Sequence, residues 1–101
     1  MRHYLLFYQF ADDYAARRTN LRQAHLTLAW QASEQGILKL AGALDEPVDQ
    51  GVLLFHCDSQ QQVEAFAEAD PYVTQGLVSQ WHIRPWITVV GDTASQPLYP
   101  A

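Results

Sequence analysis

Apolar residues fall into four runs along the chain, and these runs predict four strands. Tyr4–Phe10 is rich in Tyr, Leu and Phe, which indicates a first strand that is largely buried on both faces. Ile37–Leu44 predicts a second strand, in which Gly42 is either a weak point or a place of close approach. The continuous apolar run Val52–Phe55, ending around residue 57, is typical of a central strand. Leu77–Val90 alternates along most of its length and predicts the last strand.

A first helix is predicted from apolar positions at helical spacing. Its expected range is Leu21–Gln35, with Asn20 as the N-cap and with Asp12–Thr19 before it as a polar loop. Gly36 can adopt the left-handed conformation that commonly ends a helix. The apolar positions expected to form the buried stripe of this helix are Leu21, Ala24, Leu26, Leu28, Ala29, Trp30 and Ala32.

A capping-box pattern marks the second helix. The Ser-x-x-Gln sequence that begins at Ser59 predicts a helix over Gln60–Ala69. Pro71 ends this helix, because the residue before a proline disfavours α geometry. Asp70 is then placed to cap a short turn over residues 72–76.

The order strand, helix, strand, strand, helix, strand predicts an α+β fold. Its simplest closure is a ferredoxin-like βαββαβ plait, a four-stranded antiparallel sheet with both helices on one face. Pro85 lacks a backbone N–H, so it favours an edge position or a bulge in the last strand. The domain is expected to span residues 1–90. Residues 91–101, which are polar with two prolines, are expected to form a C-terminal tail or arm.

Strands that are apolar on both sides have a consequence for assembly. Two helices cover only one face of the sheet, and the uncovered face would be an apolar patch larger than soluble monomers usually tolerate. Either the sheets of two subunits pair, or the face lines a ligand cavity, and both can hold together. We therefore expect a homodimer whose sheets pack face to face as a dimeric α+β barrel.

Composition and charge narrow the class of partner. The chain has 101 residues, 49% of them hydrophobic and 17% charged, which fits one domain with its own core and excludes a disordered chain. The net charge of −5 and the pI near 5.1 argue against nucleic acid and anionic membranes as partners, because both attract basic surfaces. No secretory leader and no membrane-spanning run is recognisable, so a cytoplasmic location is expected.

The chemistry is also limited by residues and motifs that the sequence lacks. Cys57 is the single cysteine, which excludes an internal disulfide and a thiolate zinc cluster, and it is expected to be an inert buried thiol. His3, His56 and His82 are dispersed, so no metal site is expected. There is neither a Gly-x-Ser-x-Gly elbow nor a phosphate-binding glycine loop. Chemistry without a cofactor on a small-molecule substrate is therefore favoured.

Four polar side chains are candidates for a site, and each also has a structural explanation. His25 lies at the edge of the apolar stripe, where a histidine is either a satisfied boundary residue or an acid–base group. Asp70 either caps a helical turn or holds an imidazole. Arg22, one turn before His25, either meets a substrate carboxylate or enolate or is simply solvated. Tyr72 either donates to a ligand oxygen or anchors a turn with its ring.

Several of these positions belong to motifs of a known family. The segments are Tyr4…Phe7-Tyr8, Arg22-x-x-His25-Leu26, Gly36…Ala41-Gly42, Ala69-Asp70-Pro71-Tyr72-x-x-x-Gly76-Leu77 and Arg84-Pro85-Trp86. From about Tyr4 to Trp86 the chain resembles the YciI-like (YCII-related) domain. The resemblance implies a dimeric α+β barrel of ferredoxin-like subunits with a cleft centred on His25 and Asp70. Ala43 stands where family members often carry proline, which bears on the shape of the cleft wall.

The resemblance also implies roles for the site residues. His25 and Asp70 take the catalytic positions, and Arg22, Tyr72 and Gly42 take positions that bind the substrate. One relative of the family is a dehydrochlorinase that acts on a chlorinated hydroxyquinol. The wider barrel superfamily includes muconolactone isomerases and small monooxygenases.

Two classes of function stay open at this point. The first is a small cofactor-free enzyme with lyase- or isomerase-type chemistry, in which His25 and Asp70 act as an acid–base pair on a small oxygenated substrate, cyclic and chlorinated compounds included. The second is a non-catalytic dimeric domain that binds a metabolite or a protein partner through the same cleft. A polar His–Asp pair at the base of an apolar cavity favours the first, and a cavity closed by side chains favours the second.

Overall fold

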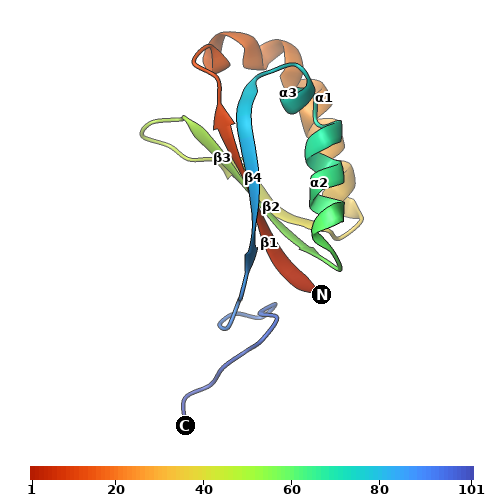
Figure 1. Ribbon diagram of the computed structural model, residues 1–101, viewed down its shortest axis with the longest axis vertical. Helices are drawn as coiled ribbons and strands as arrows, with labels where there is room; N and C mark the ends of the chain where they lie inside the picture. Colours follow the sequence, from red (N-terminus) through yellow and green to blue (C-terminus); the bar gives the residue numbers. More distant parts are fainter.

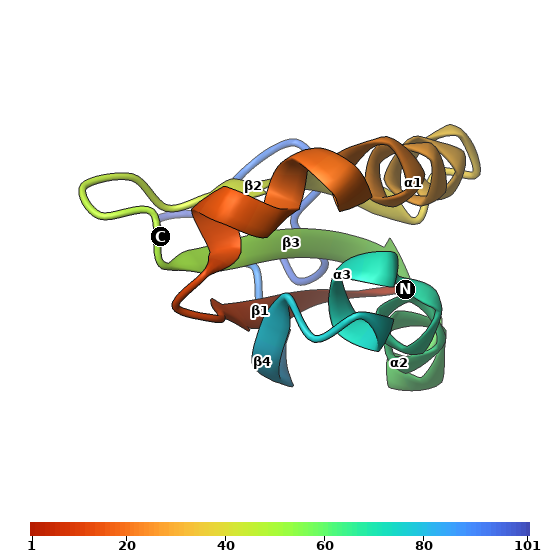
Figure 2. The ribbon, with the colours of Figure 1, turned by 90° about the horizontal axis from the view of Figure 1, so that it is seen from above.

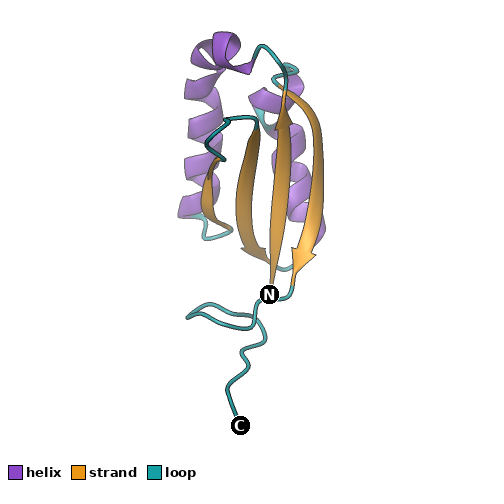
Figure 3. Cartoon of the chain, turned by 90° about the vertical axis from the view of Figure 1, so that its left-hand side faces the viewer, coloured by secondary structure: helices purple, strands orange, loops and turns teal.

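The computed structural model describes residues 1–101 and contains one four-stranded antiparallel sheet with three helices (Figure 1). The elements in chain order are β1 (Arg2–Phe10), α1 (Tyr14–Glu34), β2 (Leu38–Ala43), β3 (Gln50–Cys57), α2 (Gln60–Ala69), α3 (Pro71–Thr74) and β4 (Val78–Trp86). The strand order is β2-β3-β1-β4. Both long helices lie on the same side of the sheet, with α1 over β2 and α2 over β4 and the central strands (Figures 2 and 3). The predicted α+β plait is confirmed.

The first helix begins at Tyr14, not at Leu21 as the apolar spacing predicted. The expected loop Asp12–Thr19 is wrong, because most of it forms the first turns of α1. Asn20 is correspondingly not an N-cap, since it lies inside the helix. The residues of these turns are compatible with a helix but lack the apolar periodicity from which the start was predicted.

Contacts with the end of β1 and with a distant segment of the chain hold these first turns. The Tyr14 ring stacks on Phe10 with ring centroids 3.9 Å apart. The Arg17 guanidinium donates to the carbonyl oxygens of residues 75 and 76 and pairs with Asp13 one turn earlier at 3.5 Å. Tertiary contacts therefore extend the helix beyond its amphipathic part.

The end of α1 agrees with the prediction from the sequence. Gly36 has a φ of +83°, in the left-handed region that glycine adopts without strain. Its N–H donates to the Ser33 carbonyl at 2.9 Å, and the Ile37 N–H donates to the Ala32 carbonyl at 3.1 Å. This pair of bonds is the Schellman motif, which satisfies two of the last carbonyl groups of the helix.

The buried stripe predicted for α1 is only partly formed. Ala29 and Ala32 are buried, whereas Leu26 and Trp30 are 43% and 64% exposed. A cavity lies between this part of the helix and β2, and both side chains line it. The helix therefore covers the sheet without filling the space beneath it.

The last strand ends at Trp86 rather than at Val90. Trp86 pairs with His3, close to the first residue of β1, so the chain beyond it has no strand to pair with. Pro85 lies opposite Tyr4 on an edge strand, as its missing N–H predicted. The register shift of the β1–β4 pair lies at the other end of the strands, not near the proline.

The two faces of the sheet differ. Tyr4, Leu6, Tyr8 and Phe10 point from β1 toward the helices and are buried in the core. The opposite face, which we call the open face, is covered by no helix (Figure 3). The strand registers place on it His3, Leu5, Phe7, Leu40, Val52, Leu54, His56, His82, Arg84 and Trp86.

Residues 87–101 follow β4 without a helix or strand and project past the end of the sheet (Figure 1). The start of this segment is hydrogen-bonded to β1, because the Oγ1 atom of Thr88 lies 2.7 Å from Nδ1 of His3. None of the helices is long and apolar enough to cross a membrane.

Candidate active site

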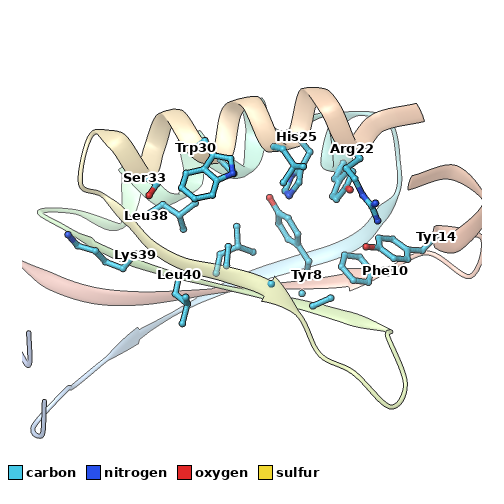
Figure 4. A pocket seen from close by; sticks show the side chains of 18 residues that line it. Tyr8, Phe10, Tyr14, Arg22, His25, Trp30, Ser33, Leu38, Lys39 and Leu40 are labelled. Carbon is cyan, nitrogen blue, oxygen red and sulfur yellow. The ribbon is translucent and has the colours of Figure 1, made fainter. Parts of the chain in front are cut away.

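A cavity of about 460 Å³ lies between α1 and the β2 side of the sheet (Figure 4). α1 provides Arg22 and His25, β1 provides Tyr8, and α3 provides Tyr72. Most of the remaining lining is apolar. Polar groups from three separate elements therefore meet at a largely apolar cavity, which is the usual composition of a small-molecule site.

Asp70 is the buried polar centre behind this cavity, and its side chain is 0% exposed. Its Oδ1 atom accepts the backbone N–H of Tyr72 at 3.0 Å, which caps α3 as predicted. Its Oδ2 atom accepts the Tyr8 hydroxyl at 2.7 Å. The Nδ1 atom of His25 lies 2.9 Å from each carboxylate oxygen. These donors satisfy the carboxylate, and a buried charge requires such partners.

The His25 ring is held in one orientation. Because an ionised carboxylate only accepts hydrogen bonds, Nδ1 carries the proton and the neutral ring leaves Nε2 without one. The Tyr72 ring stacks on the imidazole, with centroids 3.9 Å apart and 6° between the planes. The ring lines the cavity, its side chain is 14% exposed, and Nε2 makes no hydrogen bond within the chain. A fixed imidazole with one free nitrogen is the arrangement of a general base.

Arg22 and Tyr72 supply donors next to the imidazole. Burial raises the pKa of the Tyr72 hydroxyl, the neighbouring Tyr14 and Asp70 raise it further, and the Arg22 guanidinium opposes them. The hydroxyl therefore stays protonated at neutral pH and can donate. Arg22 is exposed and forms no ion pair, and Figure 4 shows it beside Tyr14 at one end of the cavity. Both side chains line the cavity, and their role in binding a substrate stays a prediction.

Gly42 also lines the cavity, but in a different way. It pairs with Val52, so the missing side chain would point to the open face and not into the cavity. A Cβ atom at Gly42 would meet nothing within 4 Å. The predicted contact between Gly42 and a substrate is therefore restricted to its backbone.

Tyr8 also lines this cavity, although the sequence analysis named it only within a family motif and gave it no role in the site. Its side chain faces the helices and is 2% exposed. Burial raises the pKa of the Tyr8 hydroxyl, and the charge of Asp70 raises it further, so the hydroxyl is a permanent donor. The available signal was the alternation of β1, which buries Tyr8, because a buried tyrosine hydroxyl needs a partner.

Two titratable groups outside the cavity are also perturbed. Burial lowers the pKa of His3, and the nearby His56 and Lys39 lower it further. Burial raises the pKa of the Cys57 thiol. Cys57 is 1% exposed, so the expectation of a buried thiol is met, and a protonated thiol is a poor nucleophile.

Fold and site together define a ferredoxin-like α+β domain with an imidazole–carboxylate pair beside an open cavity. That class includes the family which the sequence resembles. The chain belongs to the family of YCII-related domains, whose family model matches residues 1–87. No curated protein matches the chain.

Solved structures of the same fold include an enzyme. The chain is similar to 5-chloro-2-hydroxyhydroquinone dehydrochlorinase (TftG) from Burkholderia phenoliruptrix AC1100, whose structure was solved in complex with 2,5-dihydroxybenzoquinone. The two share 18% identity with a TM-score of 0.73, and the match covers 85% of this chain and 94% of that chain. Protein Atu4242 from Agrobacterium tumefaciens is similar with 13% identity, a TM-score of 0.59, and 94% and 98% covered. A NIPSNAP family protein from A. tumefaciens is similar with 13% identity and a TM-score of 0.58, and the match covers 92% of this chain and 95% of that chain. At these identities the likeness shows the fold alone.

Proposed function

We propose that the protein is a small enzyme in which His25 is the acid–base group and Asp70 holds its ring. The observation that carries the proposal is an imidazole fixed 2.9 Å from a fully buried carboxylate, with its other nitrogen free beside an open cavity. Lyase- or isomerase-type chemistry on a small oxygenated organic substrate fits this pair. The shared fold with a dehydrochlorinase supports cyclic, including chlorinated, substrates.

In the proposed step, Nε2 of His25 takes a proton from a carbon next to a carbonyl group. The electron pair of the C–H bond moves toward the carbonyl oxygen and forms an enolate. The Asp70 carboxylate stabilises the imidazolium, and Arg22 with the Tyr72 hydroxyl meets the negative oxygen. Return of the proton to another carbon completes an isomerisation. Departure of chloride from the β carbon, with the proton passing from His25 to solvent, completes an elimination.

Non-catalytic binding through the same cavity is the alternative. A cavity filled by side chains would favour it, because the polar pair would then be purely structural. The space of about 460 Å³ beside His25 favours catalysis instead. Simple binding also does not require an imidazole fixed both by a carboxylate and by a stacked ring.

A panel of hydroxylated and chlorinated quinols and cyclic ketones in D2O tests the catalytic proposal. NMR detects proton exchange and isomerisation, and a chloride assay detects elimination. We expect His25→Ala to abolish turnover and Asp70→Asn to reduce it, because the ring loses its orientation. His82→Ala removes a histidine of the open face and is expected to keep full activity. Turnover by His25→Ala at the level of the unsubstituted protein would contradict the proposal.

We also propose that two chains pair through the open face as a homodimer. Leu5, Phe7 and Leu54 lie on this face, and a mostly apolar hollow of about 370 Å³ is formed beside them. Sedimentation at micromolar concentration is expected to give a dimer, since an interface of standard size persists there. Leu54→Arg is expected to give a monomer, whereas Val48→Arg in an exposed loop is expected to leave the dimer. A monomeric unsubstituted protein would contradict the pairing.

A further inference from the structure

The charged side chains that line the cavity are all basic, although the chain has a net charge of −5. They are Arg22 and Lys39, and no Asp or Glu lines the cavity. Asp70 lies behind His25 with its carboxylate 0% exposed and fully hydrogen-bonded, so a ligand in the cavity does not contact it. Arg22 has no ion-pair partner. The cavity therefore favours an anion over a neutral or cationic ligand.

Small side chains line part of both walls of the cavity. Its sheet-side wall contains Ala41, Ala43 and Gly51, and α1 contributes Ala29 opposite them. Gly51 has little room for a side chain, because a Cβ atom there would lie 3.1 Å from the Phe10 ring. Small side chains on both walls leave a slot that suits a planar group.

The slot is longer than one ring requires. Figure 4 shows Arg22 at one end and Ser33 with Lys39 at the other, with the Trp30 ring between them. Arg22 and Ser33 are eleven positions apart on α1, which is about 16 Å along the helix axis. An apolar cavity of ~150 Å³ holds one benzene ring, and this cavity measures about 460 Å³.

We propose that the cavity takes an elongated planar anion, a carboxylate or enolate carried on two or more rings. Its negative group lies at Arg22, beside the free nitrogen of His25, and its apolar body extends under Trp30. This inference rests on the proposed function and narrows its substrate class. The binding it describes is nevertheless measurable without turnover.

The inference has two parts, the negative charge of the ligand and its length, and calorimetric titration tests both. The probes are benzoate, 2-naphthoate and biphenyl-4-carboxylate, each compared with its neutral amide. We expect affinity to rise with the number of rings and each carboxylate to bind about fivefold or more tightly than its amide. Arg22→Gln is expected to remove the preference for the carboxylate. Arg18→Gln, one turn away on α1 and outside the cavity lining, is the matched control and is expected to keep it. Trp30→Ala is expected to weaken the two-ring probes more than benzoate.

Equal affinity for carboxylates and amides, no gain from a second ring, or no binding of any probe would overturn the inference. The His25→Ala variant separates it from the proposed function. Probe binding that survives His25→Ala, in a protein with no turnover of any substrate, would contradict only the catalytic proposal. Turnover of a neutral one-ring substrate at a rate unchanged by Arg22→Gln would overturn only the inference about the anion.

Discussion

Replacing Tyr8 with phenylalanine removes one hydrogen-bond donor from the buried Asp70 carboxylate and leaves the aromatic ring in place. The lost bond is the 2.7 Å contact from the Tyr8 hydroxyl to Oδ2. A hydrogen bond to a charged group contributes roughly 1.5–3 kcal/mol. Asp70 keeps the bonds from His25 and the Tyr72 N–H, so we expect a loss of about 2 kcal/mol in the free energy of unfolding. Urea denaturation measures this loss, and Tm is expected to fall by about 10 °C.

Tyr4→Phe is the matched control for this prediction. Tyr4 lies on the same strand and the same face and is 4% exposed, but its hydroxyl makes no hydrogen bond within the chain. Its loss is expected to change stability by less than about 0.5 kcal/mol. Both variants are compared at one protein concentration. Equal losses in the two variants would refute the argument that Tyr8 supports Asp70.

Three further predictions concern stability. The folded pKa of His3 lies below its unfolded value, so the unfolded state binds more protons below about pH 6.5. The free energy of unfolding should therefore fall from pH 7 to pH 5. His3→Gln should reduce that fall, as measured by urea titration at each pH. Gln62→Ala removes the acceptor of the Asp58 and Ser59 N–H groups and should cost about 1 kcal/mol in urea denaturation, while the neighbouring Gln61→Ala should cost little. Gly36→Ala, at a φ of +83°, should lower stability by about 1 kcal/mol, whereas Gly42→Ala, without such a φ, should not; equal thermal shifts would contradict this.

The fold was predictable because its strands and caps are local features. The apolar runs located all four strands, and Gly36 marked the end of α1 through a property of its own backbone. The start of α1 was not predictable in this way. Arg17 bonds to carbonyl groups about sixty positions further along the chain, and no pattern within the helix contains that contact.

The candidate site was predictable only with the help of the family resemblance. From spacing alone, His25 could be a boundary residue and Asp70 a helix cap. In the structure the Asp70 carboxylate both caps α3 and contacts the His25 imidazole. His25 and Asp70 are 45 positions apart in the sequence, and the fold brings them together. Tyr8 was missing from the prediction because its partner depends on how α3 sits against β1.

The position of the proton on the His25 ring tests the catalytic account most directly. Long-range ¹H–¹⁵N NMR at pH 8, with His25→Ala used to assign the signals, distinguishes the two ring nitrogens. The account predicts a proton on Nδ1, bonded to Asp70, and an unprotonated Nε2 whose signal shifts when 2-naphthoate is added. A ring that carries its proton on Nε2 would contradict it, because no base would then face the cavity.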